Sequence, residues 1–471
     1  MGYADAGPFG NPLIATPAID AMVEKGQTWT NFYSSAPVCT PSRGALLTGK
    51  LPVRTGLYGN QISVFFPGSK TGLPHSENTI AEVFQQENYA TGMFGKWHLG
   101  DARTYYPTRH GFDEWLGIPY SNDMDWEVDG INIGNIFNPP QKIAEKWALV
   151  TPKIMEMVYQ PNINDWQVPL VHSRRESHGV FKDRELERPA KQKVITQIYT
   201  NESINFIRRS VKENKPFFVY LAHSMPHVPL FRSTDFEGKS RAGIYGDVIE
   251  EIDFNVGRLV ETLKEKGVFD NTLIIYTSDN GPWLNFGSHA GSSGELRGGK
   301  FDVFEGGYRV PCVISWPDVI AENTIIDQLV STIDLLPTVC AITDAELPKN
   351  KIDGISVLDT FKNIAIPELD DRFYYYHKGY NLLGIRQGNW KYLAPSTYNE
   401  IIVPGEDAKS GTSNWATDFP EVLFDLSSDV RELDNRLGDN PEKAAFLKQQ
   451  LAVFQKELDD EARPIGEIGK D

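Results

Sequence analysis

The chain has 471 residues, of which 40% are hydrophobic and 23% charged. This is a globular composition with room for one large domain and a smaller one. The 46 basic and 63 acidic residues give a net charge of −17, a field that repels nucleic acids and anionic membranes and so excludes a phosphate-backbone binder. No run reaches the roughly 18 to 20 apolar residues of a membrane span, and the three cysteines make no disulfide framework.

The amino terminus reads MGYADAGPFGNP and is rich in glycine and proline. It has neither the charged segment nor the apolar segment of a secretory signal peptide. Turn-forming residues of this kind are an unusual start for a domain, so we expect either an initial loop or a chain from which an upstream segment has been removed.

Three segments in the first two-thirds of the chain pair an amphipathic helix with a short apolar run. Hydrophobic residues in each helix recur every three or four positions, and the run PFFVYL at 216–221 is typical of a strand covered on both faces. Such alternation builds right-handed βαβ units, which predicts an α/β fold with a large, mostly parallel central sheet flanked by helices. The predicted helix and strand pairs are Thr79–Glu87 with Tyr89–Phe94, Lys191–Glu213 with Pro216–Leu221, and Ile244–Lys266 with Thr272–Thr277.

Polar side chains follow each of these predicted strands at its carboxyl end. Lys96 and His98 follow the first strand, His227 follows the second, and Asp279 and Asn280 follow the third. In open α/β sheets the functional site lies in the crevice beyond those strand ends. The pattern therefore brings these five residues towards one place.

The later part of the chain has a different character. Residues 141–188 show no clean period and are predicted to form an irregular insertion, whereas short strands separated by glycine and asparagine turns begin near residue 371. A boundary near residue 365 divides a catalytic domain, 1–365, from a smaller α+β subdomain with an antiparallel sheet, 366–471. The predicted elements of that subdomain are the strands Phe373–His377, Leu382–Arg386 and Trp390–Leu393 and the helix Pro441–Glu461.

The motif CTPSRGALLTG occupies residues 39–49. Thr40 can cap a helix that begins at Pro41, which places Cys39 just before a helix N-terminus, where backbone N–H groups favour an anion. Arg43, one turn later, offers guanidinium donors for a tetrahedral oxyanion. A buried structural cysteine beside a capped helix explains the same residues equally well.

This motif resembles the type I sulfatase signature C-x-P-S-R-x-x-x-L-T-G, and further stretches resemble the same family in the same order along nearly the whole chain. They point to arylsulfatase A-like and N-acetylgalactosamine-6-sulfatase-like enzymes of the alkaline phosphatase superfamily. The resemblance implies that superfamily's fold. The stretches are GKWHLG at 95–100, IPYSND at 118–123, MPHVPL at 225–230, TSDNG at 277–281, GGKFDVFEGGYRVP at 298–311 and GIRQGNWKYL at 384–393.

The resemblance implies a formylglycine at Cys39, made after translation by a formylglycine-generating enzyme and hydrated to a gem-diol. One hydroxyl, activated by a divalent metal, would attack the sulfur and displace the alcohol, and the second would then expel sulfate. In the family's pattern Lys300 and His227 contact the leaving oxygen and bind substrate, and Ser121 binds a sulfate oxygen. The remaining catalytic residues that the resemblance implies are Arg43, Lys96 and His98.

The resemblance also implies a metal site. Asp279, Asn280 and the group derived from Cys39 would hold Ca²⁺, with Mg²⁺ as the alternative ion, because hard oxygen donors suit these cations. Family members carry two further aspartates on a strand just before the stretch that begins here at Gly2. We therefore expect the N-terminus to be truncated, the first strand to be missing, and the chain as given to be inactive.

The predicted substrate is a small-molecule or glycan sulfate ester, in the periplasmic, secreted or lysosomal setting usual for the family. One alternative is a phosphonate or phosphodiester hydrolase of the same superfamily. Another is a pseudoenzyme that binds sulfated glycans without cleaving them. A cysteine hydrolase fits the helix-capped motif poorly.

Overall fold

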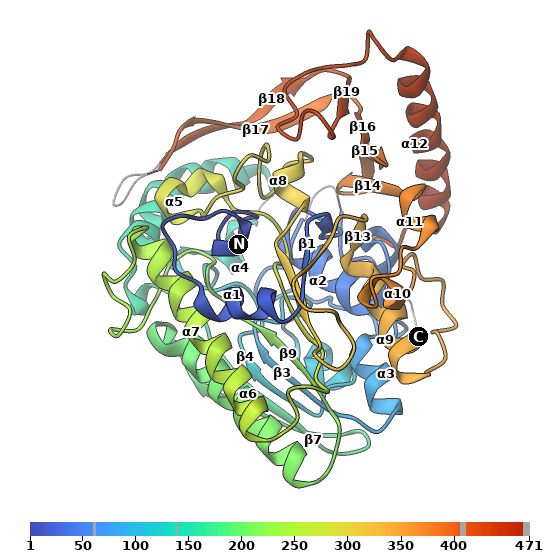
Figure 1. Ribbon diagram of the computed structural model, residues 1–471. Coiled ribbons are helices and arrows are strands. Elements are labelled where there is room, and N and C mark those ends of the chain that lie inside the picture. The colour runs from blue at the N-terminus through green and yellow to red at the C-terminus, as the bar shows by residue number, and fades with distance from the viewer. Residues whose placement is uncertain (60–62, 138–139, 406–410, 465–471) are drawn as a thin grey trace.

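The computed structural model describes residues 1–59, 63–137, 140–405 and 411–464. Its core is a β layer enclosed by helices (Figure 1). One sheet has the strand order β8-β7-β4-β3-β9 and the other has the order β10-β11-β1-β12. The strands are β3 (Ala90–Gly95), β4 (Glu114–Gly117), β7 (Leu170–Ser177), β8 (Val180–Glu187) and β9 (Phe217–Ala222) in the first sheet, and β1 (Gln27–Trp29), β10 (Ile274–Thr277), β11 (Cys312–Ser315) and β12 (Thr324–Ile326) in the second.

The predicted α/β class is confirmed, and both sheets are mixed in orientation. Strand β3 pairs in parallel with β4 and β9, while β7 and β8 continue that sheet as an antiparallel hairpin. In the second sheet β1 is parallel to β12, but β11 is antiparallel to both β1 and β10. The parallel pairs of the first sheet are therefore β4, β3 and the edge strand β9, and Lys96 and His98 follow the end of β3.

Helices cover both faces of this layer. Two long helices lie on one face and three shorter ones on the other (Figure 1). The first face is packed with Phe206, Val248 and Ile252, and the second with Val83 and Leu336. The helices are α6 (Ile195–Lys212) and α7 (Gly243–Glu265), and α2 (Cys39–Thr48), α3 (Ile80–Gln86) and α9 (Leu335–Thr343), with α1 (Pro17–Glu24) beside α7.

Strands β9 and β10 each have one edge without a strand partner in the described part of the chain. The two strands belong to the same layer, because Phe218 of β9 and Ile275 of β10 pack against one cluster, and Val219 and Tyr276 pack against another. Residues 217–221 are partly exposed, whereas the whole of β3 is buried. The expectation of a strand covered on both faces is confirmed for β9, and its open edge leaves the side chains less enclosed than those of an interior strand.

The other predicted helices and strands of the catalytic domain are confirmed within a few residues. Helix α3 begins with a capping box in which Thr79 accepts from the Glu82 N–H and the Glu82 carboxylate accepts from the Thr79 N–H. The helix predicted from residue 191 starts as a short 3₁₀ turn, and α6 proper begins at Ile195.

The prediction of an irregular insertion at residues 141–188 was wrong. This segment contains helix α5 (Ile143–Tyr159) and the hairpin of β7 and β8. Pro152 interrupts the hydrophobic period of the helix, and the partly solvated β8 carries many charged residues in place of a clean alternation. The connecting elements before α5 are β5 (Glu127–Val128), β6 (Ile131–Asn132) and α4 (Ile133–Ile136).

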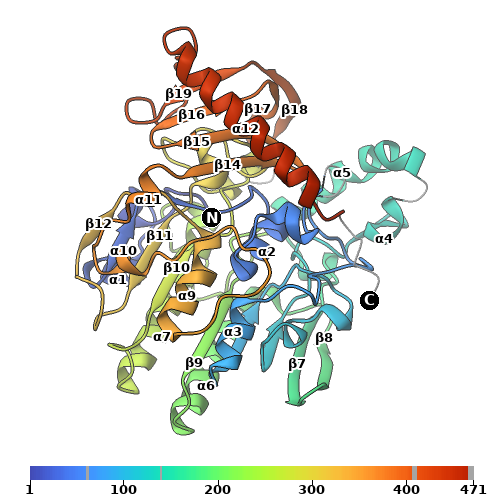
Figure 2. The ribbon, with the colours of Figure 1, turned by 90° about the vertical axis from the view of Figure 1, so that its right-hand side faces the viewer.

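A separate antiparallel sheet, crossed by a long helix, forms the upper part of the molecule (Figure 2). Its strand order is β14-β15-β16-β19, and the hairpin of β17 and β18 reaches from it to the catalytic domain, where the Asn285 amide donates to Ser413 Oγ at 2.6 Å. The strands and terminal helix predicted here are confirmed. The elements are β14 (Phe373–Lys378), β15 (Asn381–Gln387), β16 (Trp390–Leu393), β17 (Ser396–Val403), β18 (Thr412–Phe419), β19 (Val422–Asp425) and α12 (Pro441–Glu461).

A buried ionic cluster connects the upper sheet to the catalytic domain. Lys391 on β16 lies 3.0 Å from Glu305 Oε1 and 2.7 Å from Glu432 Oε1, with all three side chains fully buried. Among the described residues no helix is long and apolar enough to cross a lipid bilayer. The joining elements are β2 (Phe32–Tyr33), β13 (Val330–Ser331), α8 (Glu305–Tyr308), α10 (Leu358–Phe361) and α11 (Pro367–Asp370).

Candidate active site

Cys39 is the first residue of helix α2 and is 2% exposed. The helix begins two residues earlier than predicted, because Val38 is the extended N-cap and no side chain caps it. Thr40 instead lies in the first turn, where its hydroxyl donates to the His98 carbonyl at 2.9 Å and accepts from the Phe65 N–H at 3.1 Å. These two bonds hold helix α2 against the segment that carries His98.

Arg43 joins helix α2 to the turn after β10. Its Nε donates to Asp279 Oδ2 at 2.8 Å, and one of its terminal nitrogens donates to the Lys96 carbonyl at 2.7 Å. Ser42 adds a hydroxyl bond to the Asp279 carbonyl. Burial alone would raise the pKa of Asp279, but the positive charges of Arg43, Lys96 and Lys300 outweigh it and hold that pKa below its usual range.

Lys96 lies directly after β3, and its ammonium group reaches Cys39. Nζ is 3.4 Å from Cys39 Sγ and also 3.4 Å from Ser121 Oγ, and the residue is 1% exposed. The backbone N–H of Lys96 donates to Ala222 at the end of β9, so two neighbouring strand ends fix its position. Burial lowers the pKa of Lys96, partly offset by Cys39.

His98 is buried and neutral. It adopts a left-handed backbone conformation with φ of 63°, which turns the chain sharply after Lys96. Nε2 donates to the Phe65 carbonyl at 2.9 Å, so the proton is on Nε2 and Nδ1 keeps a free lone pair. Burial, helped by the charge of Lys96, holds the pKa of His98 well below its usual value.

His227 and Lys300 form the opposite side of the site. Lys300 Nζ lies 2.9 Å from His227 Nε2 and 4.4 Å from the centre of the Trp283 ring. Because His227 Nδ1 donates to the Val228 carbonyl at 2.7 Å, Nε2 is the acceptor for the lysine ammonium. Burial and the charge of Lys300 hold the pKa of His227 well below its usual value.

Ser121 links the two sides. Its Oγ lies 3.4 Å from Lys96 Nζ and 3.4 Å from His227 Nδ1. The structure thus brings together the predicted catalytic and substrate-binding residues around Cys39, through a chain of contacts that runs from helix α2 to Lys300. The residues in this chain of contacts are Cys39, Arg43, Lys96, His98, Ser121, His227, Asp279 and Lys300.

Asp279 and Asn280 are the right type of oxygen donor for a calcium or magnesium ion, but two residues are too few to hold one. Asp279 and Asn280 offer hard oxygens, and Asn280 Oδ1 is buried without a hydrogen-bond partner in the described structure. Calcium prefers six to eight oxygens, however, and no cluster of three His, Cys, Asp or Glu side chains suited to a metal occurs among the described residues. A full ligand set therefore needs oxygens that these residues do not supply.

Two residues of the site were missed by reasoning from the sequence. Asn122 donates its amide to the carbonyls of His227 at 3.3 Å and Pro229 at 3.1 Å, and so fixes the His227 segment. Asp123 Oδ1 lies 3.9 Å from His227 Nδ1. Both belong to the stretch IPYSND, from which the sequence singled out Ser121 alone. No local pattern in a predicted loop shows which of its polar residues face the site.

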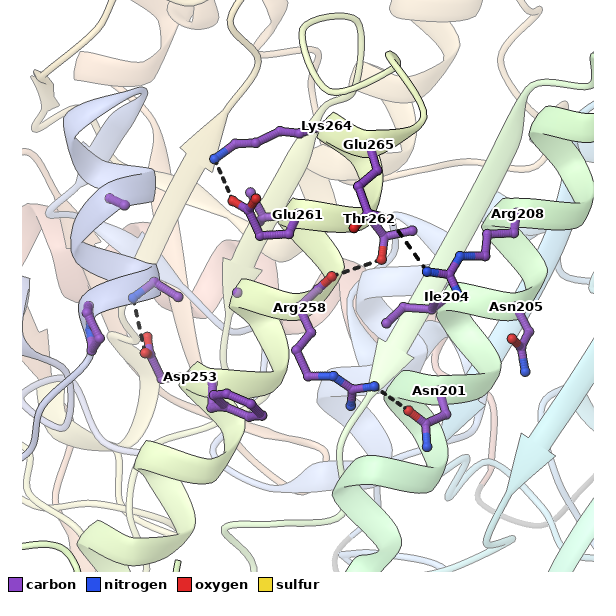
Figure 3. Close-up of a pocket in the computed structure, with 16 residues that line it drawn as sticks. Asn201, Ile204, Asn205, Arg208, Asp253, Arg258, Glu261, Thr262, Lys264 and Glu265 are labelled. Carbon is purple, nitrogen blue, oxygen red and sulfur yellow. Dashed lines mark hydrogen bonds and ion pairs between the residues drawn. The ribbon is translucent and has the colours of Figure 1, made fainter. Parts of the chain in front are cut away.

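A groove of about 770 Å³ lies away from this site, between α1, α6 and α7 (Figure 3). Its polar side chains are largely paired with one another, as Arg258 with Asn201 at 2.7 Å and Lys264 with Glu261 at 2.8 Å. Such pairing offers little to a ligand, so this groove is not the candidate active site.

Comparisons with known proteins show the family to which this chain belongs. A family model described as Sulfatase matches residues 1–345, and one described as N-sulphoglucosamine sulphohydrolase, C-terminal matches residues 299–394. The chain is 34% identical to arylsulfatase A of Bos taurus over 467 residues, which are 97% of this chain and 85% of that protein. It is 31% identical to N-acetylgalactosamine-6-sulfatase of Mus musculus over 448 residues, with coverages of 92% and 79%.

The same likeness extends to solved structures. The crystal structure of the PsFucS1 sulfatase from Pseudoalteromonas sp. matches with a TM-score of 0.79 and 25% identity, over 100% of this chain and 90% of that one. The chain therefore belongs to the sulfatase family, enzymes of the alkaline phosphatase superfamily that hydrolyse sulfate esters, and it resembles arylsulfatase A and N-acetylgalactosamine-6-sulfatase within it.

Proposed function

We propose that this chain cleaves the sulfate monoester of a small molecule or a glycan into an alcohol and sulfate, with a nucleophile derived from Cys39. The observation that supports this most strongly is the concentration of cations around a buried cysteine. Lys96 contacts Cys39, Arg43 donates to the Lys96 carbonyl, and the charge of Lys300 acts on the neighbouring Asp279, in a chain whose net charge is −17. Fixed positive groups in a water-poor site select an anion and stabilise the charge that develops on it.

Conversion of Cys39 to formylglycine would supply a hydrated aldehyde as the nucleophile. The position suits this role, because the side chain lies at a helix N-terminus where backbone N–H groups favour an oxyanion. Lys96 would hold that oxygen and, with Ser121, a sulfate oxygen. Arg43 would keep Lys96 in place through its bond to the Lys96 carbonyl.

The departing alcohol needs a proton or a positive charge on the far side. Lys300 meets this need, because its ammonium group is held by His227 Nε2 and by the face of Trp283. His227 accepts from Lys300 and cannot itself donate at Nε2 while neutral, so Lys300 is the group that carries the proton. His98, with its free Nδ1, is the base that removes the proton when sulfate is released.

A calcium or magnesium ion on Asp279, Asn280 and the group at position 39 would add the charge that lowers the pKa of the nucleophile. Because these residues supply too few oxygens, we infer that the 471-residue chain binds the ion weakly and turns over slowly, in place of the complete inactivity expected from the sequence. Asp279 is meanwhile neutralised by Arg43.

Parallel assays on 4-nitrophenyl sulfate and a phenyl phosphonate monoester test the proposal, with the chain co-expressed with a formylglycine-generating enzyme and supplied with Ca²⁺. We expect sulfate ester hydrolysis to exceed phosphonate hydrolysis. The reverse order would favour the phosphonate hydrolase. Binding of a sulfated glycan with no turnover, even after a strand that carries two aspartates has been added upstream, would favour the pseudoenzyme.

A further inference from the structure

Asp123 is an acidic residue of the site to which the proposed mechanism gives no role. It lies in the loop after β4, where the Met124 N–H donates to the Ser121 carbonyl at 3.1 Å and closes a tight turn. The neighbouring Asn122 is fully buried and bonds to two carbonyls of the His227 segment. The backbone on both sides of Asp123 is therefore fixed, and its carboxylate is held beside His227.

The Asp123 carboxylate has an unused acceptor. Oδ1 is buried and has no hydrogen-bond partner in the described structure, although the side chain as a whole is 21% exposed. It lies 3.9 Å from His227 Nδ1, too far for a hydrogen bond, and that nitrogen already donates to Val228. Burial raises the pKa of Asp123, opposed by the charge of Lys300, by a side-chain hydrogen bond with Ser121 and by the charge of Lys96.

Asp123 is badly placed to help the sulfate group itself. A carboxylate repels the sulfate oxygens, so it directs them towards Lys96 and Arg43 and leaves its own side of the site to the alcohol part of the substrate. A buried acceptor without a partner is costly, and a hydroxyl donor on the ligand would remove that cost. His227 and Lys300, which would contact the ester oxygen, lie beside Asp123. A substrate hydroxyl close to the ester would therefore lie within reach of the Asp123 carboxylate.

We propose that Asp123 is a substrate-binding residue that accepts a hydrogen bond from a hydroxyl group close to the sulfate ester, and so makes the site selective for sulfated polyols such as sugars over simple alkyl or aryl sulfates. This inference rests on the proposed function, because it assumes that a sulfate ester occupies the site. It adds the requirement that the alcohol part of the substrate carry a hydroxyl group, a feature that the cations around Cys39 do not recognise.

A comparison of three small ligands measures the effect of that hydroxyl on binding. Cyclohexyl sulfate has none, and the cis and trans isomers of 2-hydroxycyclohexyl sulfate each place one beside the ester. Titration calorimetry with the 471-residue chain measures binding without turnover. We expect at least one hydroxylated isomer to bind about tenfold more tightly than cyclohexyl sulfate, as a hydrogen bond to a charged group implies.

The variants Asp123→Ala and Asp123→Asn test the residue itself. We expect Asp123→Ala to bind all three ligands equally, with cyclohexyl sulfate bound at least as well as by the original chain, and Asp123→Asn to keep part of the preference. Asp129→Asn, an exposed change nearby, is the matched control and keeps the full preference. Thermal unfolding curves identify any variant that fails to fold. If Asp123→Ala does not fold, the nearly isosteric Asp123→Asn is used alone to test the preference.

The outcomes separate the two proposals. A preference that survives in both Asp123 variants, or no preference in the original chain, overturns the inference and leaves the proposed function intact. Failure of the original chain to bind any of the three sulfate esters overturns the proposed function, and the inference with it.

Discussion

The guanidinium of Arg43 lies 2.8 Å from the carboxylate of Asp279, although the two residues are 236 positions apart in the sequence. Arg43 is on the helix that begins at Cys39, and Asp279 follows the end of β10. The pair therefore fixes the nucleophile helix relative to the turn that carries the proposed metal ligands. Its members are 7% and 20% exposed, so solvent screens the interaction little.

Replacing Arg43 with alanine should destabilise the fold by about 3–5 kcal/mol, because it leaves the Asp279 carboxylate buried without its main partner. Urea denaturation at pH 7 measures this change. Asp279→Asn combined with Arg43→Ala should cost less than the sum of the two single changes. Arg241→Ala, at an exposed position, is the control and should change stability little.

The same pair predicts how stability depends on pH. Because the folded pKa of Asp279 is depressed, its contribution to stability is present above the unfolded pKa of about 3.9 and is lost as pH falls towards the lower folded value. In Arg43→Ala that depression is smaller, so the variant should lose less stability than the original chain between about pH 4 and pH 2. Equal acid sensitivity of the two chains would contradict the assignment of the pKa shift to Arg43.

Cys39→Ala should abolish hydrolysis and leave the fold intact, because it removes a single sulfur atom at the first residue of a helix. In the original chain, co-expressed with a formylglycine-generating enzyme, mass spectrometry of the peptide that spans Cys39 should show an aldehyde in place of the thiol. Only free thiol, with that enzyme demonstrably active on another substrate, would count against the mechanism. Cys340→Ala is a control that leaves turnover unchanged.

Lys300→Ala should raise the barrier to hydrolysis by about 2–4 kcal/mol, as expected for the loss of a donor to a developing oxyanion. The ratio kcat/KM measures it, and the effect should be smallest for 4-nitrophenyl sulfate, whose leaving group needs little protonation. Lys349→Ala, at an exposed position, is the matched control. Normal turnover of alkyl sulfates by Lys300→Ala would remove this lysine from the proposed reaction.

The 471-residue chain should bind Ca²⁺ weakly, because Asp279 and Asn280 supply two of the six or more oxygens that the ion prefers. Adding an upstream segment that ends in two aspartates should raise calcium affinity and turnover together, as measured by calorimetry and by assay. It should also slow hydrogen exchange in β9 and β10, whose open edges would gain a strand partner. Tight calcium binding by the unextended chain would show that the ligands lie elsewhere.

Glu432→Gln should stabilise the protein at pH 8 and change it little at pH 5. Burial, together with the negative charge of Glu305, raises the pKa of Glu432 to about 7, although Lys391 opposes the shift. Its stabilising contribution is therefore present at low pH and is lost as pH rises through that value. Thermal unfolding at both pH values measures the difference, and a variant less stable than the original at pH 8 would contradict this pKa shift.

The sequence by itself determined the class of fold and most elements around the site. Hydrophobic periods predicted α3, α6 and α7 and the strands β3, β9 and β10, because amphipathic helices and apolar strands leave a local pattern. The motif at Cys39, with the stretches that resemble the same family, also predicted which residues would meet at the carboxyl ends of the strands. These residues are close because the topology of an α/β sheet brings strand ends together.

Only the tertiary structure decided the contacts that give those residues their properties. Hydrogen bonds to Phe65 and Val228, which no sequence pattern marks, set the tautomers of His98 and His227. The open edges of β9 and β10 depend on pairing between strands far apart in the chain. Asp123 remained hidden for the same reason: an acidic residue in a loop looks solvated until folding buries one of its oxygens beside His227.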